Sequence, residues 1–393
     1  MARKAAPGRR WPLAFYLALA ANLFFFASFQ WSYVTLPGFI QELGGGAAEI
    51  GLAFGLSTLS AVVLRPFIGP LIDRWGRKQA LLVGSFLFAL EPVLYTLVGS
   101  IGLFLAVRLI RGLAIAAFTT AYTTLVADLA PAERRGEAVG LAGVTNNVGM
   151  LFAPALGAAM QVRWGYTPHF WGAAALALVS FALVLPLKEA RGFSQAVPAG
   201  PGFWSVGRLR PVWLASFAGT GLAVGYGAAL SFMPPFATER GLGAAGGYFT
   251  AFALAVMASQ ATAGWLSDRL GRRAVVLPGM VVAGLASAGL AMAWTDLALL
   301  AAGAGLGLSW GLVRAGLDAS LVDSVPGASR GAAFAFLYTC FDAGIGAGSY
   351  GLGLLAEAEG YAAAFYAAGA WAAVALAGYL AWGRRPGTVR DGA

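Results

Sequence analysis

Long apolar segments recur from one end of this sequence to the other, and they limit the folds that the chain can form. Each segment has about twenty residues, the length with which a helix crosses ~30 Å of hydrocarbon. With 59% hydrophobic residues in 393, the chain holds more apolar surface than a soluble domain of this size could bury. We therefore expect an all-α integral membrane protein.

Twelve such segments predict twelve transmembrane helices. The first follows the basic stretch "MARKAAPGRR", but its apolar run is too long for a signal peptide and no small-residue cleavage site is evident, so we expect a permanent helix. The expected spans are residues 13–35, 50–72, 79–98, 101–126, 137–160, 168–187, 213–236, 246–267, 275–295, 297–321, 332–356 and 361–382.

The basic residues predict the orientation. Most of the 26 lysines and arginines fall on the side of the membrane that holds the N-terminus, if the spans alternate in direction. The positive-inside rule then places both termini in the cytoplasm. We expect the chain to lie in the cytoplasmic membrane. The net charge of +9 is explained by basic loops that face anionic lipid, so it does not indicate nucleic-acid binding. Cys340 is the single cysteine and cannot form an intrachain disulfide.

The second half of the chain repeats the first. The stretch "GPLIDRWGRK" begins at Gly69, and "GWLSDRLGRR" begins at Gly264, 195 residues later. At this offset five residues recur in the same order. Gly69, Asp73, Arg74, Gly76 and Arg77 correspond to Gly264, Asp268, Arg269, Gly271 and Arg272. The same offset relates Asp128, Pro131, Arg135 and Gly136 to Asp323, Pro326, Arg330 and Gly331. Two copies of a six-helix unit follow from this repeat.

The repeat divides the chain into three parts. We expect an N-terminal six-helix bundle over 1–188, a cytoplasmic linker rich in Gly, Pro and Ser over 189–210, and a C-terminal six-helix bundle over 211–393. Because each half has an even number of spans, the halves share one orientation and are related by an axis along the membrane normal.

The repeated pattern G-x-L-x-D-R-x-G-R-[KR], between the second and third spans and again between the eighth and ninth, resembles the major facilitator superfamily. The resemblance covers the whole chain. It implies two six-helix repeats around a central cavity, alternating access to the two sides of the membrane, and transport of a small organic solute.

Two further motifs carry the same resemblance. In the fourth span, "RLIRG" resembles the R-x-x-Q-G element of the family, with Arg108 at its arginine position and Arg111 where glutamine is usual. The fifth span resembles the element of drug and metabolite antiporters, with Ala153 in place of one glycine; it holds Gly140, Gly149, Pro154 and Gly157. Such spacing gives a helix a smooth, slightly bent face for close packing. The resemblance therefore favours an exporter.

The repeated charges suggest a conformational latch. Asp73 and Asp268 end the second and eighth spans, and each is followed by a glycine turn that presents arginines to facing helices. Such clusters could hold the halves together on the inside and break when the protein opens inward. The alternative, that the clusters only follow the positive-inside rule, explains the arginines but neither the aspartates nor the repetition.

Ionisable residues within the spans are the candidates for proton coupling. Each costs about 2.5–3.5 kcal/mol near mid-bilayer, so such residues face a wet cavity or a partner. Arg314 and Asp318 stand four residues apart on one helical face, where they form either an exchangeable or a static ion pair. Glu91 and Asp342 are the reserve candidates, and the first span offers no acid. Arg65 alternatively snorkels to the membrane surface.

Other polar and aromatic side chains of the spans are candidates for lining a cavity suited to an amphiphilic solute. They are Arg314, Arg108, Arg111, Asn146, Asn147, Tyr122, Tyr226, Gln260, Trp310 and Tyr338.

Several activities are disfavoured. The sequence has no phosphate-binding loop of the G-x4-G-K-[ST] type and no loop long enough for a soluble catalytic domain. His169 is the only histidine, and a lone histidine is more typical of a hydrogen-bonding role than of a metal site. We expect no enzyme, no cofactor and no metal.

Our prediction is a monomeric carrier that exports a drug or metabolite in exchange for protons. Its partners are a small organic solute, protons and the lipid bilayer, without nucleic acid. The alternatives are a proton-coupled nutrient importer, a lipid-translocating carrier of the same fold, and a receptor or scaffold that has lost transport.

Overall fold

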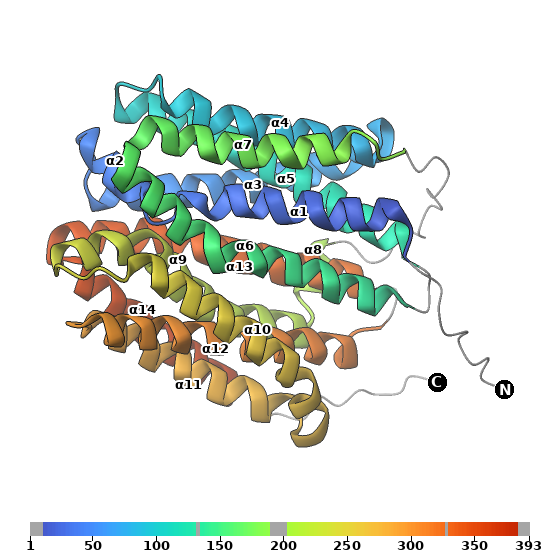
Figure 1. Ribbon diagram of the computed structural model, residues 1–393. Coiled ribbons are helices and arrows are strands. Elements are labelled where there is room, and N and C mark those ends of the chain that lie inside the picture. Colours follow the sequence, from blue (N-terminus) through green and yellow to red (C-terminus); the bar gives the residue numbers. More distant parts are fainter. Residues whose placement is uncertain (1–10, 131–133, 189–202, 327–328, 384–393) are drawn as a thin grey trace, which may run out of the picture.

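The computed structural model describes residues 11–130, 134–188, 203–326 and 329–383 (Figure 1). Its helices are α1 (Leu13–Trp31), α2 (Leu36–Glu42), α3 (Ala47–Trp75), α4 (Arg77–Tyr95), α5 (Ile101–Leu129), α6 (Arg135–Trp164), α7 (Tyr166–Val184), α8 (Phe203–Gly207), α9 (Arg210–Glu239), α10 (Ala245–Leu270), α11 (Arg272–Ala291), α12 (Asp296–Ser324), α13 (Arg330–Glu359) and α14 (Tyr361–Gly383). Within this described part, twelve helices are long, and α2 and α8 are short.

Each predicted span corresponds to one long helix, which confirms the all-α fold of two six-helix repeats. The largest difference lies in the first span. Its helix ends at Trp31, and after a turn Pro37 lies in the first turn of α2, where its fixed φ fits and its missing N–H costs nothing. The predicted linker over 189–210 falls mainly on residues outside the described ranges. Its last residues form α8, and α9 begins at Arg210.

Nine of the described helices are long and apolar enough to cross a membrane, and the bent pair Ala245–Gln260 and Thr262–Leu270 would raise the number to ten. The remaining two long helices, α6 and α13, carry polar residues such as Asn146 and Asp342. Both helices lie against the opposite half of the molecule, α6 against α10 and α13 against α3. The polar residues of these two helices can therefore be shielded from lipid by the opposite half.

Sharp turns separate consecutive helices at the repeated glycines. Gly76 joins α3 to α4 with φ of 103°, and Gly271 joins α10 to α11 with φ of 91°. A residue with a Cβ atom rarely adopts such angles, so the glycines of the repeated pattern are required by these turns. We call the end of the bundle that holds Gly76 and Gly271 the motif end, and the opposite end, which holds Gly44 and Gly360, the far end.

The two halves form two groups of roughly parallel or antiparallel helices (Figure 1). One group contains α1 and α3–α7, coloured blue to green, and the other contains α9–α14, coloured yellow-green to red. Each half has its own buried core, with Phe25, Phe88 and Phe118 in the first and Val313 and Leu337 in the second.

A third core joins the halves at the far end. It contains Phe54 from α3 together with Phe232 from α9 and Phe249 from α10. Helices α3 and α13 approach so closely there that a Cβ atom on Gly51 would lie 2.2 Å from the carbonyl oxygen of Ser349. Helices α6 and α10 also meet, where Thr250 Oγ1 donates a hydrogen bond of 2.8 Å to the carbonyl oxygen of Leu151. The halves are therefore packed together at the far end.

Candidate functional site

A cavity of about 740 Å³ lies between the halves on the side of the motif end. This volume lies within the range of about 300–1,000 Å³ that is typical of small-molecule sites. Helices α3, α5, α8 and α13 supply its walls, which consist of Val62, Arg65, Thr119, Thr120, Thr123, Phe203, Trp204, Ala335, Tyr338 and Thr339. Trp204 is largely exposed, so the cavity reaches the surface near α8.

The threonines make one wall of this cavity amphiphilic. Thr119 Oγ1 donates to the carbonyl oxygen of Ile115 at 2.8 Å, and Thr123 Oγ1 donates to that of Thr119 at 3.0 Å. Because each hydroxyl proton is used within α5, the side chain presents a methyl group and a hydrogen-bond acceptor. These threonines were not among the predicted cavity residues, although "TTAYTT" carries threonines at a spacing of four.

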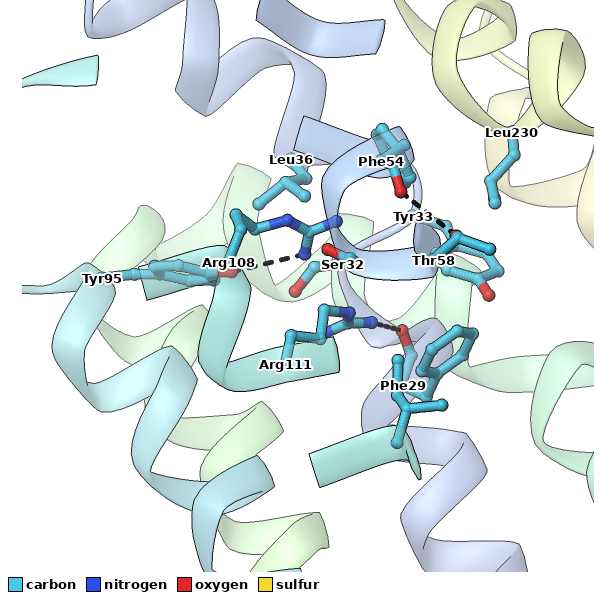
Figure 2. A pocket seen from close by; sticks show the side chains of 12 residues that line it. Phe29, Ser32, Tyr33, Leu36, Phe54, Thr58, Tyr95, Arg108, Arg111 and Leu230 are labelled. Atoms are coloured by element: carbon cyan, nitrogen blue, oxygen red, sulfur yellow. Dashed lines mark hydrogen bonds between the residues drawn. The ribbon is translucent and has the colours of Figure 1, made fainter. Parts of the chain in front are cut away.

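A second, smaller pocket lies one helical turn further from the motif end. Thr58 and Ile115 line this pocket, whereas Val62 and Thr119, four residues later on the same helices, line the large cavity. The pocket is shown in Figure 2, with Leu230 of α9 on the side of the second half. Its polar lining includes Arg108 and Arg111. We call this pocket the arginine pocket.

Three buried charges meet beside the arginine pocket. Arg111 Nη1 lies 2.8 Å from Glu91 Oε2, and Arg108 Nη1 lies 3.4 Å from Glu91 Oε1. The Tyr95 hydroxyl donates a hydrogen bond to Glu91 Oε1. Glu91 is fully buried and Arg108 is 1% exposed. All four residues belong to α4 and α5, so this cluster lies within the first half.

Further contacts hold the two arginines in place. Arg108 Nε donates to the carbonyl oxygen of Ala53 at 3.0 Å, and Arg111 Nη2 donates to that of Phe29 at 2.7 Å, as Figure 2 shows for Arg111. The guanidinium group of Arg111 also lies 4.6 Å from the ring centre of Phe29 and 4.7 Å from that of Phe88. Both arginines thus connect α5 with its neighbours α1 and α3.

The second half has its own charge cluster. Arg314 Nε lies 4.0 Å from Asp318 Oδ2, and the Tyr338 hydroxyl donates to the same oxygen at 3.1 Å. The guanidinium group of Arg314 stacks over the Tyr338 ring at 4.2 Å. Asp318 Oδ1 is buried and has no hydrogen-bond partner among the described atoms. Tyr338 therefore links Asp318 to the wall of the large cavity.

An ion pair also crosses between the halves. Arg65 of α3 and Asp342 of α13 are joined through Nη1 and Oδ2, with side chains 30% and 25% exposed. Arg65 thus has an acidic partner in this structure instead of snorkelling alone.

The remaining predicted cavity residues lie in several places. Asn146 accepts a hydrogen bond of 2.5 Å from Asn22 Nδ2, whereas Asn147 donates to the carbonyl oxygen of Gly143 in its own helix. Tyr122 stacks on Phe118 within the first half. Tyr226 packs against Trp310 at 4.6 Å, and Gln260 is exposed on α10.

His169 has a structural environment. Its Nδ1 lies 2.9 Å from the carbonyl oxygen of Gly157, and its Nε2 lies 2.9 Å from Thr35 Oγ1. The described residues contain no group of three or more histidine, cysteine, aspartate or glutamate side chains that could hold a metal ion.

The charges of the repeated motif form equivalent contacts in the two halves. Arg77 Nε lies 3.3 Å from Asp128 Oδ2, and Arg272 Nε lies 2.7 Å from Asp323 Oδ2, the corresponding pair. Arg272 also forms an ion pair with Asp268. These contacts lie within each half. Arg74 and Arg269 are exposed, Gly264 has open space around its Cα atom, and the surroundings of Gly69, Asp73 and Gly140 lie outside the described part of the structure.

The glycine pattern of the fifth span faces its own half. A Cβ atom on Gly149 would lie 2.9 Å from the backbone nitrogen of Ala27, and one on Gly157 would lie 2.1 Å from the carbonyl oxygen of Trp31. Both contacts are with α1, and Pro154 lies inside α6. The contact between α6 and α10 of the other half uses Leu151, described above, and Ala155.

Comparison with known proteins agrees with this arrangement. The sequence profile of the family described as Major Facilitator Superfamily matches residues 18–250 and 244–393. The chain belongs to the major facilitator superfamily. It is thus a multi-pass membrane protein of a family of transporters that carry small solutes.

Two curated relatives are similar over part of their length. A segment of 152 residues is 25% identical to the quinolone resistance protein NorA of Staphylococcus aureus and covers 39% of each chain. A segment of 181 residues is 25% identical to Multidrug resistance protein 2 of Bacillus subtilis and covers 46% of this chain and 45% of the relative. The chain therefore matches less than half the length of these relatives.

Solved structures share the fold over nearly the whole chain. A bacterial homolog of the human lysosomal transporter Spinster, in an inward-facing and unoccupied conformation, has a TM-score of 0.78 at 18% identity and covers 96% of this chain and 98% of its own. The nucleoside transporter NupG has a TM-score of 0.77 at 13% identity, with coverage of 94% and 99%. At such identities the likeness concerns the fold alone.

Proposed function

We propose that this member of the superfamily exports small amphiphilic organic solutes, drugs or metabolites, in exchange for protons. The names of the relatives NorA and Multidrug resistance protein 2 associate them with drug resistance. The glycine pattern of α6, which packs against α1 at Gly149 and Gly157, supports the same class.

The single observation that carries the proposal is the cavity of about 740 Å³ between the halves. Its walls alternate hydroxyl and aromatic groups with apolar ones, which suits an amphiphilic solute. The shared core around Phe54, Phe232 and Phe249 separates it from the far end. In an alternating-access cycle this core would have to open while the cavity closes toward the motif end.

The distribution of basic residues supports a cytoplasmic location of the motif end. Arg74, Arg77, Arg269 and Arg272 all lie there, and the positive-inside rule places such loops inside the cell. The state described here would then be the one that loads a solute from the cytoplasm. Because one chain contributes both halves of the cavity, a monomer is sufficient for transport.

Asp318 is our candidate for the proton site. Its carboxylate shares Oδ2 with Tyr338, a residue of the cavity wall, and has Arg314 as its ion-pair partner. A solute that contacts Tyr338 would change the hydrogen bond to Asp318, and so change the affinity of the carboxylate for a proton. By linkage the proton would change solute affinity by the same factor.

Transport direction tests the proposal. Inside-out membrane vesicles that contain the protein are given an acidic lumen and a chemically broad set of labelled solutes. An exporter that exchanges protons accumulates its solute in the lumen, and a protonophore abolishes the accumulation. Accumulation only in right-side-out vesicles with an acidic exterior would instead identify a proton-coupled importer and contradict the proposal.

A further inference from the structure

The arginine pocket carries an excess of positive charge. Two guanidinium groups of its lining, Arg108 and Arg111, pair with one carboxylate, Glu91, and none of the described residues that line the pocket is acidic. One positive charge remains when Glu91 is ionised, and two remain when it is protonated. A buried charge without a counter-ion is costly, so the pocket favours an anion.

The other intramembrane charges are balanced. Arg65 pairs with Asp342, and Arg314 pairs with Asp318, so the described charges at the large cavity cancel. The excess is therefore confined to the arginine pocket, at the closed end of the space between the halves. Within the space between the halves, an anion would meet an uncompensated positive charge only in the arginine pocket.

The arginines also retain unused donors. Arg108 donates through Nε and Nη1, and Arg111 donates through Nη1 and Nη2. Arg108 Nη2 and Arg111 Nε have no acceptor in the described part of the chain. Figure 2 shows both guanidinium groups reaching from α5 into the same pocket, close to Ser32. Guanidinium donors in this arrangement match the two oxygens of a carboxylate.

We infer that the transported solute is an amphiphilic organic anion whose carboxylate is bound by Arg108 and Arg111 while its apolar body occupies the large cavity. The linings of the two spaces lie one helical turn, about 5.4 Å, apart, a distance that a single amphiphilic molecule can span. The inference rests on the solute transport proposed above, and it requires neither a direction nor proton exchange. Arg111 is the better position for a test because Arg108 also holds the backbone of α3 through Ala53.

Binding of matched probes tests this inference without a gradient. The purified protein in nanodiscs of zwitterionic lipid is titrated with naphthalene-2-carboxylate and with its neutral amide, and the two Kd values are measured by calorimetry. We expect the wild type to bind the carboxylate at least about tenfold more tightly than the amide, the value of one charge-assisted hydrogen bond. No saturable binding of the carboxylate, or equal affinity for both probes, overturns the inference.

Variants test whether the preference for the carboxylate over the amide arises in the arginine pocket. Arg111→Gln introduces the residue usual in the R-x-x-Q-G element and is expected to bring the affinity ratio close to one, whereas Arg111→Lys retains part of the preference. Arg163→Gln, at the far-end terminus of α6, is the control and keeps the full ratio. If Arg111→Gln does not fold, Glu91→Gln, which leaves both guanidinium groups unpaired, is expected to raise the ratio. A preference unchanged in the folded Arg111 variant or in Glu91→Gln overturns the inference.

The outcomes separate this inference from the proposed function. A carboxylate preference together with import in vesicles would refute the proposed export but leave the anion site standing. Export of neutral or cationic solutes without a carboxylate preference would refute the anion site alone.

Discussion

Arg65 on α3 and Asp342 on α13 form an ion pair that joins the two halves beside the large cavity. The same two helices form the close contact of Gly51 with Ser349 at the far end. Any motion that separates α3 from α13 must therefore break this pair or give Asp342 another partner.

The first prediction concerns this pair. Asp342→Asn and Arg65→Gln should each slow transport, and the double variant should be no slower than the slower single variant, because both changes remove the same interaction. For side chains about a quarter exposed, the coupling in unfolding free energy should not exceed about 1 kcal/mol. Initial rates and thermal unfolding of the four proteins measure the cycle. Fully additive effects would show that the two residues act independently.

The second prediction concerns the repeated motif. Asp268→Asn removes one of the two carboxylates that contact Arg272, and we expect slower transport with normal folding, since Asp268 is 70% exposed on its side chain. Asp73→Asn, the repeat equivalent, should have a similar or larger effect. Glu359→Gln, an exposed acid at the far end of α13, is the control. Wild-type rates in both motif variants, or misfolding seen by gel filtration, would refute the latch.

The third prediction concerns packing of α6 on α1. Gly149→Leu should lower stability by roughly 1–3 kcal/mol and impair transport, because its side chain would meet the backbone of Ala27. Gly143→Leu on the same helix should be tolerated, since nothing lies within 4 Å of a Cβ atom there. The two variants are compared by Tm and by transport rate. Equal tolerance would reduce the glycine pattern to a matter of composition.

The fourth prediction concerns charge movement. If an anion leaves the cell while a proton enters, each cycle moves at least two positive charges inward, and an inside-negative potential should accelerate export. Right-side-out vesicles are loaded with the carboxylate probe, and an inside-negative potassium diffusion potential is set with valinomycin. This potential is expected to increase the rate of efflux. Efflux that is independent of the potential would contradict exchange of an anion for a proton.

The sequence was sufficient to predict the fold because length and repetition determine it. An apolar segment of about twenty residues has little alternative to a transmembrane helix. Gly76 and Gly271, at equivalent places in the repeat, are the two positive-φ turns that the pattern predicted. The pairing of Arg314 with Asp318 was also predictable, since residues four apart on one helix are neighbours.

Contacts between different helices were harder to predict from the sequence. Glu91 reaches Arg111 twenty positions later in the sequence, and Asp342 reaches Arg65 of the other half, because of how the helices pack. Tyr122 was expected in a cavity, but it lies in the buried core of the first half, stacked on Phe118 one turn earlier on the same helix. The orientation of α5 turns Thr119 and Thr123 to the cavity instead. Spacing along one helix does not determine which face meets a partner.

If protons taken up at Asp318 drive export, removing this carboxylate should uncouple transport from the proton gradient. Inside-out vesicles containing either the wild type or Asp318→Asn receive an acidic lumen, and solute accumulation is followed together with proton release from the lumen. Asp296→Asn, at the far end of the same helix α12, serves as the control because its side chain keeps an oxygen for the Ala244 N–H. We predict that the wild type and the control accumulate solute and release protons, whereas Asp318→Asn binds solute but does neither. Uphill accumulation by Asp318→Asn with an unchanged dependence on pH would contradict the account.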